Sequence, residues 1–267
     1  MARRASISIT MNDPLLLQLL TGITIGLGAG YLGAFMVLKR MSLVGDALSH
    51  VALPGIALAL LLHINPFIGA FAALTIAVIG IWTLEQRTNL PSETLVGIFF
   101  TISLALGLLL TPEPELLEAL FGDIAKIGPA DLFIAILAVG ITFGVMSYAR
   151  KGFILSIISS DLAKASGIAV RHIHFLFLML VALIVALGLN VAGTLLMGSL
   201  VIIPAAAAKN LASNMFSYTW MASILGGVAA GAGILLAYFY NFSPGPMVVL
   251  AGGVIFLLTL FSQNTRL

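Results

Sequence analysis

The sequence has 267 residues, of which 61% are hydrophobic and only 8% are charged, and its mean hydropathy is +1.17. Soluble domains carry about 25% charged residues, so this composition excludes an ordinary cytosolic enzyme, a nucleic-acid binder and a disordered chain. Cysteine is absent, which excludes disulfides and thiolate metal sites, and the composition predicts a polytopic membrane protein.

Apolar segments follow one another along the chain, and each is a predicted membrane helix. A spanning helix needs about 20 residues, because the hydrocarbon is about 30 Å thick and each residue rises about 1.5 Å. We place nine segments, at about 15–38, 46–62, 66–84, 94–110, 130–148, 173–189, 193–208, 218–239 and 246–262. The predicted fold class is all-α, a compact bundle of eight or nine transmembrane helices in a single domain. This domain covers 11–267, and residues 1–10 are expected to be a disordered N-terminal extension.

Prolines interrupt two of these segments. Pro54-Gly55 lies in the second segment and Pro204 in the seventh. Proline removes a backbone donor, and in lipid such a break persists only where protein or a water-filled cavity satisfies the freed groups. We therefore expect Pro54, Gly55 and Pro204 to be points at which the helices flex.

The distribution of positive charge predicts the orientation. With nine spans, nine of the 12 Lys and Arg residues fall on one set of loops and three on the other, so the first set is cytoplasmic. The N-terminus is then outside and the C-terminus inside. If 193–208 is re-entrant, the count is eight and both termini share one side. We prefer nine, because Lys209 then lies inside.

An acidic loop at 111–129 lies on the external side in this topology. It could gather cations or dock a partner, although an acidic loop is more often only solvated. Some of its apolar residues predict a short amphipathic helix at the membrane interface: Leu116, Leu117, Leu120 and Phe121.

Asp46 and His50 lie inside the second segment, where charge is rare and marks a functional site. They are spaced i, i+4, so on a helix they share one face. A helix that starts near Ser42 places His50 about 12 Å along its axis, inside the hydrocarbon. A carboxylate and an imidazole, with no thiol in the chain, suit a divalent first-row metal ion such as Mn²⁺, Zn²⁺ or Fe²⁺. Ser49 is a weaker candidate, because it points off this face.

The same spacing has other interpretations. Asp46 and His50 fit a structural ion pair as well as a ligand set, and a proton relay is a third reading. Two ligands are too few for a tight structural metal site, which suits a site through which an ion passes. The remaining histidines are weaker: His63 is expected in a solvated external turn, and His172 and His174 are expected at the cytoplasmic interface.

A short capped helix is predicted at 159–168, between two spans on the cytoplasmic side. Ser160 or Asp161 is the expected N-cap, and Gly167 is the expected C-terminal stop. Such a helix provides a rigid protruding surface to which another protein can bind. An interfacial helix without a partner is the alternative.

Motifs along the whole chain resemble one family of membrane proteins. They lie at 39–42, 45–50, 120–124, 160–167, 193–196, 200–206 and 243–246. Each motif is weak alone, but their order and spacing together are specific. The chain is similar to the permease subunits of the metal-type (zinc, manganese or iron) ATP-binding-cassette importers.

This resemblance implies a homodimer, or a pair of similar permeases, in the plasma membrane. It implies two cytoplasmic ATPase subunits, an external or periplasmic metal-binding protein, and a fold shared with the vitamin B12 and siderophore importers. In the family, the positions of Asp46 and His50 are the proposed intramembrane metal site. The family's coupling helix corresponds to Ser160, Asp161, Leu162, Ala163, Lys164, Ala165, Ser166 and Gly167.

The expected function is a permease subunit without catalysis or a cofactor of its own. The chain has no Gly-x-x-x-x-Gly-Lys-Ser/Thr motif, so ATP must bind elsewhere. A proton-coupled carrier or channel that uses Asp46 and His50 as a relay is the alternative. An intramembrane hydrolase would need a further nucleophile or metal constellation, which the other spans lack.

Overall fold

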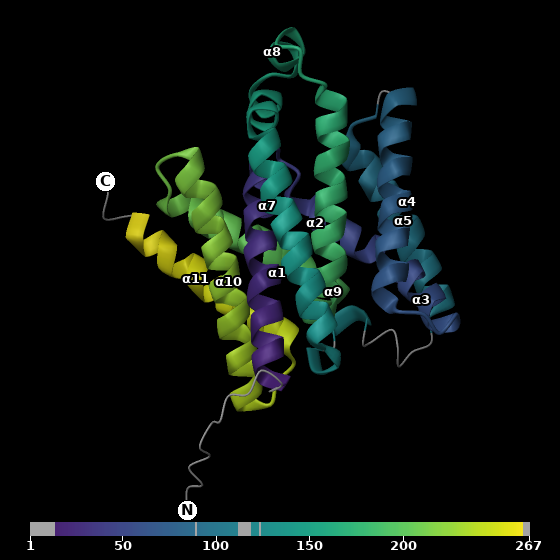
Figure 1. Ribbon diagram of the computed structural model, residues 1–267, viewed down its shortest axis with the longest axis vertical. Helices are drawn as coiled ribbons and strands as arrows, with labels where there is room; N and C mark the ends of the chain where they lie inside the picture. Colours follow the sequence, from purple (N-terminus) through teal and green to yellow (C-terminus); the bar gives the residue numbers. More distant parts are fainter. Residues whose placement is uncertain (1–13, 89, 112–118, 123, 264–267) are drawn as a thin grey trace, which may run out of the picture.

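The computed structural model describes residues 14–88, 90–111, 119–122 and 124–263, and each helix or turn of helix in Figure 1 lies in these ranges. The extension at 1–10, and Leu116 and Leu117 of the acidic loop, lie outside them. The elements are α1 (Pro14–Leu38), α2 (Ser42–Val51), α3 (Leu53–Leu61), α4 (Pro66–Arg87), α5 (Ser92–Leu110), the 3-10 turn η1 (Ile124–Lys126), α7 (Pro129–Ile158), α8 (Ser160–Ala165), α9 (Val170–Leu211), α10 (Met215–Tyr240) and α11 (Pro244–Gln263).

Eight helices in the described part of the chain are long and apolar enough to cross a membrane. They are Pro14–Leu38, Ser42–Leu61, Pro66–Arg87, Ser92–Leu110, Pro129–Ile158, Val170–Leu189, Met215–Tyr240 and Pro244–Phe261. The seventh predicted segment corresponds to a shorter apolar helix, Leu196–Leu211. Fewer than 18 residues at about 1.5 Å each do not reach across about 30 Å of hydrocarbon. The preferred count of nine full spans is therefore corrected to eight, with one shorter helix.

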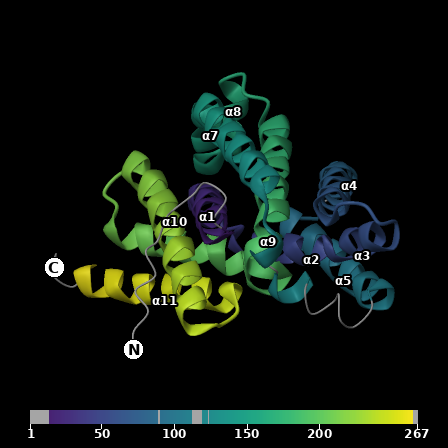
Figure 2. The same cartoon turned by 60° about the horizontal axis from the view of Figure 1, so that its bottom comes forward.

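The helices form two groups around a centre made by α1 and α9. In Figure 2, α3, α4 and α5 lie on one side of this centre, and α10 and α11 lie on the other. The short helix α8 stands at one extreme of the molecule, beyond the end of α7 and the start of α9 (Figure 1). This is the end that the charge distribution predicts to be cytoplasmic.

Glycines let α1 and α10 pack with their backbones in contact. A Cβ atom on Gly26 would collide with the carbonyl of Gly226, and one on Gly30 would collide with the carbonyl of Ala222. Ser223 strengthens the contact, because its Oγ donates a hydrogen bond to the carbonyl of Leu27 at 2.9 Å. Small residues at the interface are how membrane helices gain close packing, since lipid offers no hydrophobic drive between them. The two helices therefore form a rigid base for the centre of the bundle.

The backbone of α9 changes direction at Gly193. This residue has φ 70° and ψ 174°, outside the helical range, and the helix resumes directly after it. Gly193 lies at the boundary between the sixth and seventh predicted segments, whereas the further break that we expected at Pro204 is absent, because this proline lies inside the resumed helix. Glycine can adopt a positive φ at no steric cost, which explains why the turn occurs there.

The second span is interrupted at Ala52, two residues before the predicted proline, but Ala52 keeps helical dihedral angles of φ −70° and ψ −24°. Ala52 separates α2 from α3, and Pro54 occupies the first turn of α3, where its missing N–H is tolerated. Gly55 serves close packing here, since a Cβ on it would collide with the carbonyl of Gly69 in α4.

Candidate metal centre

Asp46 and His50 are placed on one helix, as their spacing predicts. Helix α2 begins at Ser42, so Asp46 lies in its second turn and His50 one turn further on. His50 is buried, with 9% of its surface exposed, and Asp46 is half-buried. The two donors therefore lie within a predicted membrane span, with Asp46 about one turn and His50 about two turns from its start at Ser42.

The His50 ring is held by packing and not by a hydrogen bond at Nδ1. It meets the ring of Phe100 in α5 edge-to-face, with centroids 5.3 Å apart. Its Nδ1 is buried and has no hydrogen-bond partner. A structural ion pair through this nitrogen is therefore not formed, and the atom stays available to a ligand.

Two donors are all that this helix supplies to a metal ion. Within the described ranges, no group of three or more His, Cys, Asp or Glu residues is placed to hold one. Water, backbone carbonyls or a second protein copy would have to complete the shell of a metal ion here.

Ser49 makes a contact that its position off the Asp46–His50 face did not predict. Its Oγ lies 2.6 Å from the carbonyl of Asp46 and 2.6 Å from the carbonyl of Thr194 in α9. Asp46 itself packs against Gly198 of the same half of α9. The second half of α9 thus forms a wall of the site, which helical spacing on α2 alone could not reveal.

The predicted capped helix, at the end that the charge distribution predicts to be cytoplasmic, is present as α8. Its N-cap is Ser159, whose Oγ accepts a hydrogen bond from the backbone N–H of Leu162 at 3.2 Å. This corrects the expected cap at Ser160 or Asp161. The helix ends as expected, with Gly167 at φ 76° in the left-handed region.

The surface of α8 is divided between a packed and an exposed side. Ala163 is fully buried, whereas Leu162 is 53% exposed. On the exposed side, Lys164 Nζ lies 3.7 Å from Asp161 Oδ1. An exposed leucine on a short capped helix offers apolar surface that a docking partner can bury.

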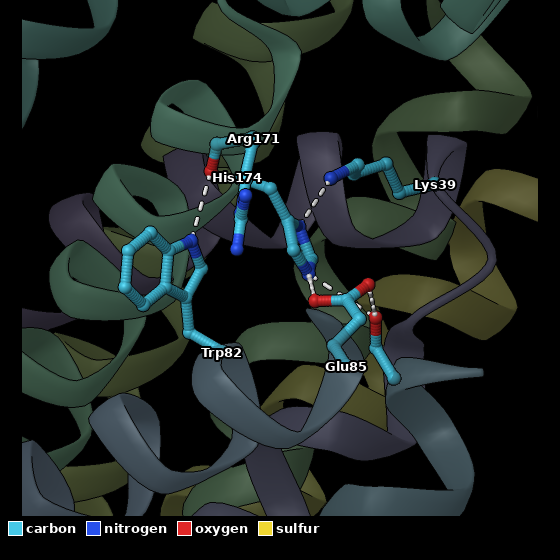
Figure 3. A network of polar contacts seen from close by, with 6 residues as sticks. Lys39, Trp82, Glu85, Arg171 and His174 are labelled. Atoms are coloured by element: carbon cyan, nitrogen blue, oxygen red, sulfur yellow. Dashed lines mark hydrogen bonds and ion pairs between the residues drawn. The ribbon is translucent and has the colours of Figure 1, made fainter. Parts of the chain in front are cut away.

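His174 is the centre of a polar network that sequence reasoning missed. We expected a residue at the cytoplasmic interface, and its side chain is only 12% exposed. Lys39 Nζ lies 2.8 Å from Nδ1, and Glu85 Oε2 lies 3.4 Å from Nε2 (Figure 3). Ser92 Oγ lies 3.2 Å from Nε2 and donates to Glu85 Oε1 at 2.6 Å. Glu85 and Ser92 are seven residues apart, but Lys39 and His174 lie far from them and from each other in the chain, so no local pattern could have indicated the network.

Electrostatics explain how the network is arranged. Lys39 can only donate, so Nδ1 of His174 accepts and a neutral ring carries its proton on Nε2, toward Glu85. Burial lowers the pKa of Lys39 to about 8, and the Glu85 carboxylate partly opposes this shift. The network joins the end of α1 to α4, α5 and α9, and it sits beside α8 around a cavity of about 790 Å³.

Comparison with known proteins identifies the kind of chain that carries these features. The model of the ABC 3 transport family matches residues 11–263. The manganese transport system membrane protein MntC of Listeria innocua is 31% identical, over 93% of this chain and 91% of that protein. The high-affinity zinc uptake system membrane protein ZnuB of Haemophilus influenzae is 35% identical, over 92% and 96%. The manganese import system permease protein ScaB of Streptococcus gordonii is 36% identical, over 91% and 89%.

Solved structures show the same fold. PsaBC from Streptococcus pneumoniae, in complex with Fab, contains a chain with a TM-score of 0.82 and 32% identity, covering 93% of this chain and 91% of that one. An inward-facing putative metal-chelate type ABC transporter has a TM-score of 0.74 at 17% identity, which shows likeness of fold alone.

Proposed function

This chain belongs to the ABC 3 transport family, and from that premise we propose that it is the membrane permease of a divalent-metal importer powered by separate ATPase subunits. The observation that carries the proposal is His50, buried one turn from Asp46 inside a membrane span. A carboxylate and an imidazole at this depth cost insertion free energy of about 2.5–3.5 kcal/mol for the charged group, so they indicate a cation pathway.

The proposed mechanism uses Asp46 and His50 as a transient site. An external metal-binding protein docks on the outer loops and releases the ion, which exchanges water for these two donors. Because two donors from one chain hold an ion loosely, the site releases it when the helices rearrange. A second permease copy would bring its own Asp46 and His50, and this dimer would sit in the plasma membrane.

The proposed drive comes through α8. ATP hydrolysis resides on cytoplasmic partners, since this sequence contains no phosphate-binding Gly-x-x-x-x-Gly-Lys-Ser/Thr motif. Closure of the ATPases would push on the side of α8 that exposes Leu162. Short connections join α8 to the end of α7 and to the start of α9, so this movement would reach both helices. Pro54, Gly55 and Pro204 remain proposed flexing points, and Gly193 joins them as the position where the structure bends.

The proposal is tested by metal uptake in cells that lack their own importer. The permease is expressed with its ATPase and binding protein, and accumulation of Mn²⁺, Zn²⁺ and Fe²⁺ is measured separately. Asp46→Ala and His50→Ala should each abolish uptake while membrane expression is unchanged. His63→Asn is the matched control, because His63 lies in an exposed turn with φ 54° that asparagine tolerates. Full uptake by both site variants would overturn the assignment of the site.

A second measurement separates the proton-coupled alternative. The permease alone is reconstituted in liposomes with a proton gradient and no ATPase. We expect no transport, and transport under these conditions would favour a secondary carrier in which Asp46 and His50 relay protons.

A further inference from the structure

Helix α2 and the second half of α9 face each other along the proposed metal site. Ser49 contacts Thr194, and Asp46 contacts Gly198. The earlier residue on α2 contacts the later residue on α9, and the later residue on α2 contacts the earlier one. The two helices therefore run antiparallel. Thr194 and Gly198 are four residues apart, so they lie on one face of their helix, turned toward α2.

Ser49 bridges these two helices with a single hydroxyl group. It is fully buried and lies 2.6 Å from two carbonyl oxygens, one in its own helix at Asp46 and one across the interface at Thr194. A serine that bonded only within its helix would leave the carbonyl of Thr194 to other partners. This serine ties the turn that carries Asp46 and His50 to the first residue after the Gly193 bend.

Gly198 provides the space in which Asp46 sits. A Cβ atom on Gly198 would lie 2.5 Å from Cβ, 2.7 Å from Oδ1 and 3.0 Å from Cα of Asp46. Rotation of the carboxylate could relieve only one of these contacts, because Cα and Cβ belong to the rigid part of the residue. A side chain on Gly198 would therefore displace the whole Asp46 residue from α9.

Two residues adjoining the Ser49 contact carry unsatisfied polar atoms. Thr194, whose carbonyl Ser49 contacts, has a buried Oγ1 without a hydrogen-bond partner, and His50, which follows Ser49 in the chain and packs its ring against Phe100 of α5, has a buried Nδ1 without one. Buried polar atoms almost always have a partner, so each of these two atoms is a candidate to accept an ion or its water.

We propose that Ser49 and Gly198 are positioning residues of the metal site, which hold the Asp46–His50 turn of α2 against the second half of α9. This rests on the proposed function and adds to it residues that shape the site without donating to the ion. Groups that orient metal ligands typically change metal affinity or activity when they are replaced, and a group that only holds the ligands in place should act on the affinity.

The test uses the complete importer with Ser49→Ala and Gly198→Ala. Mn²⁺ and Zn²⁺ are titrated into the purified permease–ATPase complex without the binding protein, which gives the Kd of the intramembrane site, and uptake with the binding protein gives the maximal rate. Loss of an orienting partner typically lowers metal affinity about 10-fold to 100-fold, so we expect Kd to rise at least about 10-fold while the maximal rate stays within about twofold.

Each variant has a matched control on the same chain. Ser156→Ala removes a hydroxyl that bonds only to a carbonyl three residues back, at Phe153. Gly253→Ala adds a methyl group where nothing lies within 4 Å. Both controls should keep the Kd of the wild type, and a rise of the same size in either control would overturn the proposal.

Asp46→Ala is measured in parallel to separate this proposal from the one on which it rests. If Asp46→Ala abolishes uptake but Ser49→Ala and Gly198→Ala keep the wild-type Kd, the positioning roles are overturned and the metal site stands. If Asp46→Ala transports normally, the metal site itself fails. A lower maximal rate with an unchanged Kd would show a packing defect and would also overturn the proposal. Where Gly198→Ala does not reach the membrane, Ser49→Ala decides alone, because it adds no atom.

Discussion

Replacing Gly193 with alanine should destabilise the protein for two separable reasons. At φ 70° and ψ 174°, Gly193 occupies a region of backbone space that is essentially reserved for glycine. In addition, a Cβ atom there would collide with the backbone carbonyl of Leu120. A backbone atom cannot rotate away as a side chain can, so the collision must move a whole segment.

The size of the effect follows from these two contributions. The backbone conformation costs about 1–3 kcal/mol for a residue other than glycine. Forcing a methyl group into a filled space costs about another 1–3 kcal/mol. We therefore expect Gly193→Ala to lower the free energy of unfolding by about 2–6 kcal/mol.

Two other glycines separate the contributions experimentally. Gly167 has φ 76° but nothing within 4 Å of its added Cβ, so Gly167→Ala should cost only about 1–2 kcal/mol of backbone strain. Gly140 lies within α7, also with nothing within 4 Å, so Gly140→Ala should stabilise by about 0.5–1 kcal/mol.

The assay is the unfolding midpoint of the purified permease in detergent, measured for all three variants by thermal and denaturant titration. The expected order of stability is Gly140→Ala at or above the wild type, then Gly167→Ala, then Gly193→Ala. The reasoning is refuted if Gly193→Ala is as stable as Gly140→Ala, because both strain and collision would then be absent.

Two further predictions concern the cytoplasmic end. Because the pKa of Lys39 is lowered from 10.5 to about 8, the unfolded chain binds more protons between these values, and stability should rise as the pH is raised from 8 toward 10.5. Lys39→Met should lose this part of the rise, and equal pH dependence in variant and wild type would contradict it. Ser159→Ala removes the N-cap of α8 and should weaken that helix by about 0.5–2 kcal/mol, so ATP hydrolysis should become less dependent on metal delivery, as with a polar substitution of Leu162. Ser160→Ala should behave as the wild type, and the opposite ranking would restore Ser160 as the cap.

Helical spacing and composition were sufficient to place Asp46 and His50 on one face of a membrane helix. The start of α2 at Ser42 and the left-handed stop at Gly167 could also be predicted, because both depend on neighbouring residues. The predicted N-cap of α8 was wrong, because Ser159, Ser160 and Asp161 are adjacent polar residues that can each cap a helix, and the backbone conformation selects Ser159. The boundary between the predicted segments 173–189 and 193–208 matches the turn of α9 at Gly193, whereas the further break expected at Pro204 is absent, because the helix around that proline continues.

Scarcity of charge by itself determined that this chain is a multi-pass membrane protein and that Asp46 stands out within it. This follows from the cost of burying charge in hydrocarbon, which acts on each residue separately. Only the tertiary structure showed that Ser49 and Gly198 flank Asp46, and that Lys39, Glu85 and His174 meet at one end. These contacts join segments up to about 150 residues apart, so they depend on how whole helices pack, and helix packing is set by surfaces that no local stretch of sequence contains.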